Sequence, residues 1–351
     1  MRSPRRTRAD TAGRRHRKAL RPVLGVGIGL LLASGLSAAS VRPASASVHY
    51  AVAVPSASGH VYVTNQLDDT VSVIDAATNK VTATVPAGTA PEGIAVTPDG
   101  KHAYIADNGS AEVSVLDTGT NKIVATVPVG KDPSGVGLSP DGMFLYVANG
   151  GSNSVSVLDT RTNRVAASVP VGTSPVSVAV SRDGGSAYVA NTGSGNMSVI
   201  DTRTHRVVRV LPAGRFPVGV AVTPDGGSVY VANEVAASVS VVATHAGTIT
   251  ATVPVGLGPF DVALGQDGRS VYVAVLGPGK VSMIDTSTHR VSATVSVGPY
   301  GTDPFNLAVA SSAVYVTEQG AGTLTVIDPK TFKVVATITV GTSPYGVAVS
   351  P

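Results

Sequence analysis

The residues that could perform chemistry are those that depart from an otherwise repeated pattern. Seven equivalent segments each begin with a proline, at Pro91, Pro133, Pro175, Pro217, Pro259, Pro304 and Pro344. The second residue after the proline is Gly or Ser in five segments, but it is Asp261 in one and Asn306 in the next. Carboxylates transfer protons, and both carboxylates and amides bind polar ligands. These two positions are therefore the first candidates for a site.

Aromatic and charged residues occupy the neighbouring positions. We predict one ligand site from six residues at the mouth of a central channel: Asp261, Asn306, Phe260, Phe305, Glu92 and Arg215. Two oxygen-bearing side chains are too few for a hard cation, and no histidines are paired at a metal-ligand spacing. We therefore predict no metal, no cofactor and no catalytic residue.

The elements that carry these residues are copies of one unit. Its tyrosine recurs at spacings of 42, 42, 42, 42, 42 and 43 residues, at Tyr62, Tyr104, Tyr146, Tyr188, Tyr230, Tyr272 and Tyr315. Within the second unit, short apolar runs at 93–97, 103–106, 113–117 and 122–127 are separated by Gly, Pro, Asn and Asp clusters. Such runs are typical of half-buried strands.

A period in the low forties with four strands is typical of a β-propeller blade. Seven units predict an all-β fold, a seven-bladed β-propeller of four-stranded antiparallel blades with almost no helix. A β-solenoid is the alternative, but its coils are usually much shorter. Each blade leaves an apolar face that only the next blade can cover, so the ring must close.

The repeated motif resembles a known family. Tyr62-Val63-Thr64-Asn65 spells the signature of the YVTN-type β-propeller repeat proteins, and variants stand at 146–149, 188–191 and 230–233. This family is similar to archaeal surface-layer propellers and bacterial secreted propellers, and more distantly to lactonase-like propellers. The resemblance implies a propeller over essentially all of residues 47–351. It does not define an activity, because propellers carry many.

Residues present in nearly every unit are predicted to be structural. We expect the aspartates before the outermost strands, such as Asp75, to accept backbone hydrogen bonds in turns, and Asn65 and its equivalents to cap the turn that follows. We expect the tyrosine rings to fill the core between blades. The innermost-strand motif occurs eight times, at 50–54 and finally at 345–350. We predict that the C-terminal copy completes the first blade; the alternative is the N-terminal copy.

The first 46 residues have the order of a secretory signal peptide. A basic stretch over residues 1–21 is followed by an apolar run over 23–36 and by Ala44-Ser45-Ala46. We predict cleavage before Ser47, so that residues 1–46 are the signal peptide and 47–351 the propeller. An uncleaved anchor is the alternative, and Arg14-Arg15 leaves twin-arginine export open beside the Sec route.

Cleavage changes the charge of the protein. The whole chain carries a net charge of +4, but residues 1–46 hold ten of the 26 Lys and Arg and one of the 22 Asp and Glu. The remaining 16 basic and 21 acidic residues give a net charge near −5. With 4% aromatic residues, such a chain is a poor candidate for binding nucleic acid. The absence of Cys excludes disulfides and thiolate metal sites.

These observations predict a secreted, extracellular protein that acts as a non-enzymatic binding module. Any association with the cell wall is expected to be non-covalent. Its expected partner is a protein, glycan or small-molecule ligand at the channel face; nucleic acid and a stable membrane span after cleavage are not expected. We expect a monomer. The alternative is a lactonase-like or lyase-like propeller enzyme with its site at the channel mouth.

Overall fold

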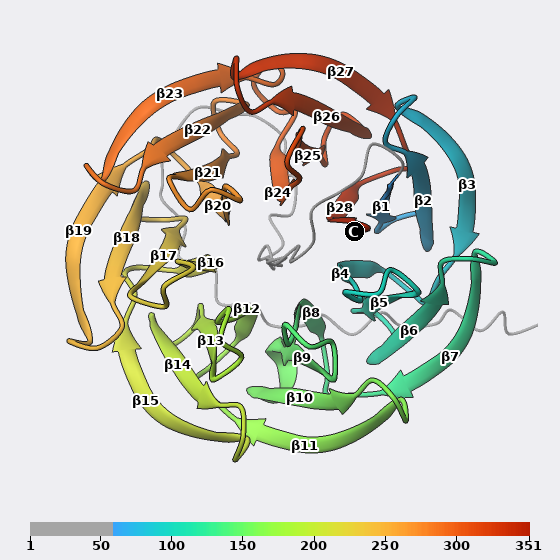
Figure 1. The fold of residues 1–351 in the computed structure, drawn as a ribbon, viewed down its shortest axis with the longest axis horizontal. Coiled ribbons are helices and arrows are strands. Elements are labelled where there is room, and N and C mark those ends of the chain that lie inside the picture. The colour runs from blue at the N-terminus through green and yellow to red at the C-terminus, as the bar shows by residue number, and fades with distance from the viewer. Residues whose placement is uncertain (1–58) are drawn as a thin grey trace, which may run out of the picture. The chain divides into compact units, whose positions relative to one another are not determined.

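The computed structural model describes residues 59–351, which form a seven-bladed β-propeller (Figure 1). They contain 28 strands and one short 3-10 helix, η1 (Gly150–Ser152). The strands build seven four-stranded antiparallel sheets, in agreement with the predicted fold. The predicted signal peptide lies outside the described residues. Among the described residues, no helix has the length and apolar character needed to cross a bilayer.

The bounds of the strands repeat from blade to blade. Blade 1 contains β28 (Pro344–Val349), β1 (His60–Asn65), β2 (Thr70–Asp75) and β3 (Lys80–Pro86). Blade 2 contains β4 (Pro91–Val96), β5 (His102–Asp107), β6 (Glu112–Asp117) and β7 (Lys122–Pro128). Blade 3 contains β8 (Pro133–Leu138), β9 (Phe144–Asn149), β10 (Ser154–Asp159) and β11 (Arg164–Pro170).

The other four blades follow the same order. Blade 4 contains β12 (Pro175–Val180), β13 (Ser186–Asn191), β14 (Asn196–Asp201) and β15 (Arg206–Pro212). Blade 5 contains β16 (Pro217–Val222), β17 (Ser228–Asn233), β18 (Ser238–Ala243) and β19 (Thr248–Pro254). Blade 6 contains β20 (Pro259–Leu264), β21 (Ser270–Val275), β22 (Lys280–Asp285) and β23 (Arg290–Ser296). Blade 7 contains β24 (Pro304–Val309), β25 (Val314–Glu318), β26 (Thr323–Asp328) and β27 (Lys333–Thr339).

Burial decreases from the centre of the ring to its rim. The innermost strands β8, β12 and β16 are buried at all six positions, whereas the outermost strands expose most of theirs. The core lies between blades: Tyr62 of β1 packs with Ile94 and Ile105 of blade 2 in one apolar cluster. The prediction that the tyrosines fill the core between blades is confirmed. Burying these faces removes apolar surface from water, which is the main favourable contribution to folding.

The C-terminal strand closes the ring. β28 pairs with β1, with Val349 opposite Val61 and Val347 opposite Val63. The amide of His60 also donates to Ser350 Oγ at 2.7 Å. The prediction that the C-terminal copy completes blade 1 is confirmed, and the competing copy at 50–54 lies outside the described residues. A physical reason is Gly346, since a Cβ there would overlap the main-chain oxygen of Glu92, whereas the N-terminal copy has Ala51 at this position.

The repeated polar residues stabilise the loops. Asp75 accepts the backbone amide of Thr78 at 2.7 Å, as predicted, and hydrogen bonds from Thr78 lower the pKa of that carboxyl. The prediction that Asn65 caps the turn that follows it is wrong. Its buried side chain donates to Ser72 Oγ of β2 at 2.9 Å and accepts the amide of Gly341 at 3.0 Å. The asparagine therefore ties a hairpin to the linker that arrives from the previous blade.

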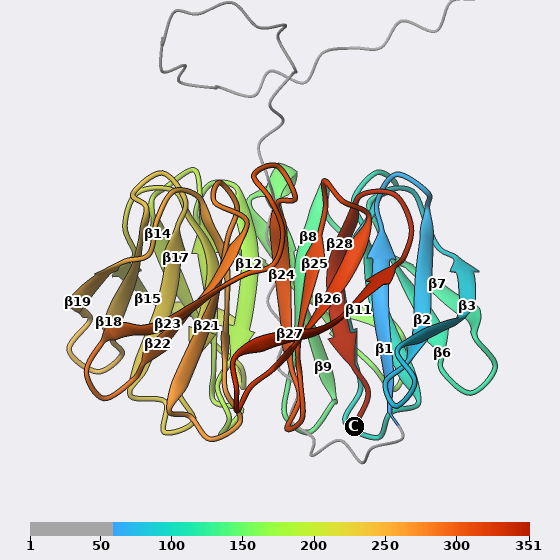
Figure 2. The same ribbon diagram turned by 90° about the horizontal axis from the view of Figure 1, so that it is seen from above.

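The loops divide between two faces of the propeller (Figure 2). The linker face, at the top of Figure 2, carries the linkers that join successive blades and the hairpins between the second and third strands, such as the β1–β2 loop. The turn face, at the end where the C terminus lies, carries the loops that follow the innermost strands. Each innermost strand begins at the linker face, so the predicted site residues lie near it.

Candidate functional site

Five of the six predicted site residues lie on innermost strands, directly after the linker proline. Glu92 belongs to β4, Phe260 and Asp261 belong to β20, and Phe305 and Asn306 belong to β24. All five are buried. The sixth, Arg215, is exposed in the linker between β15 and β16. Among the described residues, the ion pairs are Lys101–Asp99 and Arg161–Asp159, so Arg215 forms none with the other five.

A β-bulge sets the direction of these side chains. Pairing between β20 and β21 passes from Pro259 opposite Val275 to Val262 opposite Val273, so that Phe260 and Asp261 share one position of β21. The β24–β25 pair has the same irregularity, at Phe305 and Asn306. Bulges redirect side chains that a regular ladder would send to alternate faces. The bulge therefore presents an aromatic and a polar side chain at the start of each strand.

The structure brings Phe260 and Phe305 together and adds a third ring. The centroids of Phe260 and Phe305 are 3.8 Å apart, and those of Phe305 and Tyr345 are 4.7 Å apart in an edge-to-face arrangement. We call these three residues the aromatic arc. Sequence reasoning missed Tyr345, although it directly follows its linker proline as Phe260 and Phe305 do. Aromatic contacts of this kind stabilise the packing of neighbouring blades beyond the area that they bury.

Asp261 joins two blades through its carboxyl group. Oδ1 accepts the amide of Val262 at 2.9 Å, and Oδ2 accepts the amide of Leu307, in the next blade, at 3.0 Å. Burial raises the pKa of Asp261 well above the usual carboxyl range, and the two backbone hydrogen bonds oppose this rise. Both oxygens thus have backbone partners, which assigns the residue a structural role at the contact between β20 and β24.

Asn306 and Glu92 also have partners within the fold. The main-chain amide of Asn306 donates to Thr317 Oγ1 at 3.0 Å, and this hydroxyl donates to the main-chain carbonyl of Tyr345 at 2.7 Å. Glu92 Oε1 accepts Gln66 Nε2 at 2.9 Å. The described residues contain no group of three His, Asp or Glu that could hold a metal ion. The six predicted residues therefore lie near one face without forming a single polar cluster.

A second feature of the linker face is a group of exposed apolar side chains. This group, which we call the apolar sector, consists of Leu67, Val235, Leu257 and Tyr300. Their side chains are 65%, 58%, 73% and 87% exposed. They lie in the loops of blades 1 and 5 and in the linkers that lead into blades 6 and 7. The linker loops of blades 2–4 contain no large apolar side chain that is comparably exposed within the described range. The sector is thus confined to one side of the linker face.

One of the loops that present the apolar sector is irregular in length. The linker over residues 297–303 has seven residues, whereas each of the other linkers has four, and the insertion contains Tyr300. The amide of Leu276 donates to Gly258 at 2.9 Å, so the hairpin of blade 6 supports the linker that carries Leu257. In the sequence, the irregular repeats of blades 5 and 6 indicate this side of the ring. The individual residues were missed because each is unremarkable in its own loop.

Comparison with known proteins places the chain among propellers. The family profile described as a YNCE-like beta-propeller matches residues 21–150 and 141–227. Over 40 residues the chain is 55% identical to the PE-PGRS family protein PE_PGRS18 of Mycobacterium tuberculosis (strain ATCC 25618 / H37Rv). This match covers 11% of the chain and only 9% of that protein's length.

Solved structures share the architecture at low sequence identity. A functionally unknown protein from Desulfotomaculum acetoxidans DSM 771 is 17% identical with a TM-score of 0.72, covering 84% of this chain and 99% of that one. Hydrazine synthase of Kuenenia stuttgartiensis is 24% identical with a TM-score of 0.68, covering 74% and 89%. The dihydro-heme d1 dehydrogenase NirN is 18% identical with a TM-score of 0.63, covering 81% of this chain and 64% of that one. At these identities the likeness concerns the fold.

Proposed function

The chain belongs to the YNCE-like β-propeller family, and we propose that it is a secreted, non-enzymatic binding module that acts at the cell envelope or outside the cell. The partner is a protein that docks on the linker face over blades 5–7 and blade 1. This proposal depends on one observation above the others, the apolar sector.

The apolar sector supports binding because its four exposed apolar side chains all lie on one side of the linker face. Tyr300 is 87% exposed and Leu257 is 73% exposed, although other loops of this face carry small or polar residues. Clustered apolar surface rimmed by polar residues is typical of interaction sites. Aromatic side chains are also over-represented among the residues that contribute most to protein–protein binding. A protein partner suits an open surface of this kind better than a small molecule, which needs a concave site.

The aromatic arc provides a rigid base for this surface. Phe260 and Phe305 are the second residues of the strands that follow the Leu257 and Tyr300 linkers, so the packed rings fix the ends of the two loops. A surface that is fixed before binding loses less conformational entropy when the partner docks. The predicted site residues thus contribute to binding by holding the loops in place.

We give the lactonase-like alternative second place. A general acid or base must reach the reacting group, whereas both carboxyl oxygens of Asp261 accept backbone amides of the propeller itself. Turnover of a lactone panel that is lost in Asp261→Asn, while the fold is retained, would reverse this order.

A retention experiment tests the proposal. The immobilised protein is incubated with cell-envelope and culture-supernatant fractions, beside the variant Val235→Ser/Leu257→Ser/Tyr300→Ser. A matched control, Val124→Ser/Val208→Ser/Val335→Ser, changes three valines of the outermost strands that are 55%, 56% and 61% exposed. We expect the wild type and the control to retain the same protein in equal amounts. The first variant should retain at least about tenfold less of it. No retained protein, or equal retention by all three, would refute the proposal.

Export is tested separately. N-terminal sequencing of the protein from the culture supernatant or the envelope fraction should give a chain that begins at Ser47. A chain that remains in the cytoplasm with residues 1–46 intact would contradict the proposed location without affecting the binding surface.

A further inference from the structure

A pocket with a volume of about 240 Å³ opens on the turn face between blades 3 and 4. It lies at the opposite end of the propeller from the apolar sector and does not depend on the function proposed above. Its lining includes apolar or aromatic side chains and charged ones. The first group is Pro140, Phe144 and Tyr146, and the second is Asp141, Asp183 and Arg203.

One polar atom at this pocket lacks a partner. Tyr146 is 0% exposed and lines the pocket, and its hydroxyl makes no hydrogen bond to any described residue. The Nδ1 atom of His205, whose ring centroid lies 6.3 Å from that of Tyr146, is also buried without a partner in the described part of the chain. Buried hydroxyl groups in folded proteins almost always have a protein or solvent partner. The junction beside the pocket thus contains a buried hydroxyl that the described residues leave unpaired.

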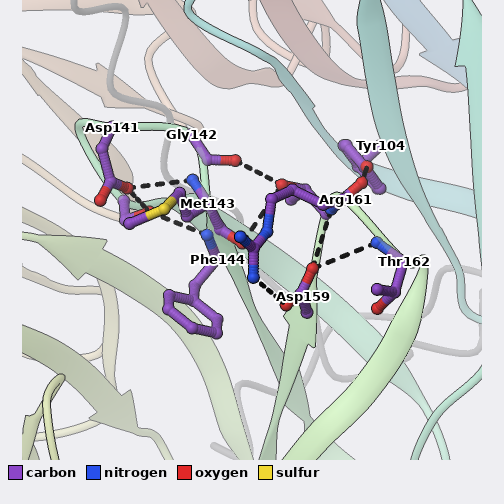
Figure 3. Close-up of polar contacts among 10 residues, drawn as sticks. Tyr104, Asp141, Gly142, Met143, Phe144, Asp159, Arg161 and Thr162 are labelled. Atoms are coloured by element: carbon purple, nitrogen blue, oxygen red, sulfur yellow. Dashed lines mark hydrogen bonds and ion pairs between the residues drawn. The ribbon is translucent and has the colours of Figure 1, made fainter.

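Equivalent tyrosines at other blade junctions are satisfied by the protein. The hydroxyl of Tyr104, which is labelled in Figure 3, lies within hydrogen-bond distance of two acceptors, the carbonyl of Thr160 at 3.1 Å and Asn163 Oδ1 at 2.9 Å. Tyr230 forms a 3.0 Å hydrogen bond with Nδ1 of His289. His205 is the counterpart of Asn163 and His289 in the repeat, yet it does not bond to Tyr146. The junction between blades 3 and 4 thus leaves unused a group that its neighbours bond internally.

The charges around the pocket exclude a simple ion. Asp141 and Asp183 are held in place, since Oδ1 of each accepts a serine hydroxyl at 2.5 Å and a backbone amide at 3.0 and 2.9 Å. Their Oδ2 atoms make no hydrogen bond to other described residues. A cation would meet Arg203, and an anion would meet the two carboxylates. A neutral polyhydroxyl ligand satisfies both signs, because each hydroxyl donates to a carboxylate and accepts from a guanidinium.

Phe144 provides the apolar element of the site. Its ring packs edge-on against His205, with the centroids 5.1 Å apart, and lines the pocket. The equivalent positions of five other units hold His60, His102, Ser186, Ser228 and Ser270. Among these six units, only the third has a phenyl ring at this position. A sugar ring has an apolar face of C–H groups that packs on an aromatic ring, and hydroxyls at its edge.

We propose that this pocket binds one pyranose ring, such as the terminal sugar of a glycan. Phe144 and Pro140 contact the C–H face, Asp141 and Asp183 accept from ring hydroxyls, and Arg203 donates to a ring oxygen or hydroxyl. A volume of about 240 Å³ lies below the range of about 300–1,000 Å³ typical of drug-sized ligands. The pocket therefore takes a single ring rather than an oligosaccharide.

Ligand-observed saturation-transfer NMR and calorimetry test the assignment on the purified protein. The probes are the methyl pyranosides of glucose, galactose, mannose and N-acetylglucosamine. We expect saturable binding of at least one, weakened about tenfold or more by Phe144→Ser and severalfold by Asp183→Asn. The matched variants at the junction between blades 2 and 3, His102→Ser and Tyr104→Phe, should leave the affinity unchanged.

Thermal unfolding separates loss of binding from loss of fold. Since the hydroxyl of Tyr146 has no partner, Tyr146→Phe should leave Tm unchanged, whereas Tyr104→Phe should lower it. Failure of all four pyranosides to bind would overturn the proposal, as would binding that Phe144→Ser does not alter. Butylamine serves as the cationic probe, and its binding in place of any sugar would assign the pocket to amines and equally overturn the proposal.

Discussion

The hydroxyl of Thr64 in β1 donates to the main-chain carbonyl of Glu92 in β4 at 2.6 Å, which joins blade 1 to blade 2. The same hydroxyl accepts the amide of Gly346 in the closing strand at 2.7 Å. Thr317 repeats this arrangement between blades 7 and 1, with the amide of Asn306 and the carbonyl of Tyr345 as partners. Threonine in this position of the repeat therefore connects neighbouring blades where the innermost strand bulges.

Replacing Thr64 by valine tests this role. Valine keeps the size of the side chain but leaves the amide of Gly346 and the carbonyl of Glu92 without their partner. Since an unpaired buried polar group costs about 1–3 kcal/mol, we expect Thr64→Val to lower the free energy of unfolding by that amount. The measurement is urea denaturation. The control is Thr126→Val, on the exposed strand β7, which should change stability by less than about 0.5 kcal/mol; an equal effect of both variants would contradict this role.

Closure by β28 predicts a large effect of truncation. Deleting residues 342–351 removes the innermost strand of blade 1 and exposes the apolar faces that it covers, so Tm should fall sharply. The measurement is thermal unfolding followed by far-ultraviolet circular dichroism. An unchanged Tm would mean that another segment, such as the copy at 50–54, can close the ring.

Gly346→Ala tests the fit of the closing strand without removing it. A Cβ at this position would overlap the main-chain oxygen of Glu92, and overpacking of this kind typically costs about 1–3 kcal/mol. Gly119→Ala is the matched control, because its Cβ would lie no closer than 3.6 Å to Asp117 Oδ1. Comparable stability of the two variants in urea would refute the close approach.

Asp107 predicts a pH dependence of stability. It occupies the position of Asn65 and Asn149 in other blades, and burial raises its pKa from 3.8 to about 6. The folded state thus holds the proton more tightly than the unfolded state. The stability that this provides is fully present below pH 3.8 and is lost as the pH rises through about 6.

Asp107→Asn should remove this loss. As the pH rises across this range, the free energy of unfolding of the variant should increase relative to that of the wild type, by at most about 3 kcal/mol. Urea denaturation at a series of pH values measures the difference. A difference between the two proteins that stays constant with pH would show that Asp107 has an ordinary pKa.

Most of the fold could be predicted because it is repeated. The spacing of Tyr62, Tyr104 and their equivalents indicates the number of blades, and alternating apolar residues indicate the strands. Even the closing strand was predictable, since the segment after Pro344 keeps the linker that precedes every other innermost strand. The role of Asn65 was not, because its partner Gly341 is brought to the β1–β2 hairpin only when the ring closes.

The site was less predictable because it depends on the bulges and on contacts between blades. Position alone places Asp261 near the channel mouth, but the bulge directs its carboxyl to the amide of Leu307. Likewise, Tyr146 and Tyr104 are equivalent in sequence, and only the structure shows that one hydroxyl is bonded and the other is not. The apolar sector escaped prediction because Val235, Leu257 and Tyr300 come from separate loops.

Hydrogen–deuterium exchange with and without the retained envelope protein is the most direct test of where this propeller binds. We predict that the partner slows exchange in the loops at 66–69, 234–237, 256–258 and 298–303, while exchange in the loops of the turn face is unchanged. Protection confined to the turn face or to the outermost strands, or no protection anywhere, would contradict a binding module that uses the linker face.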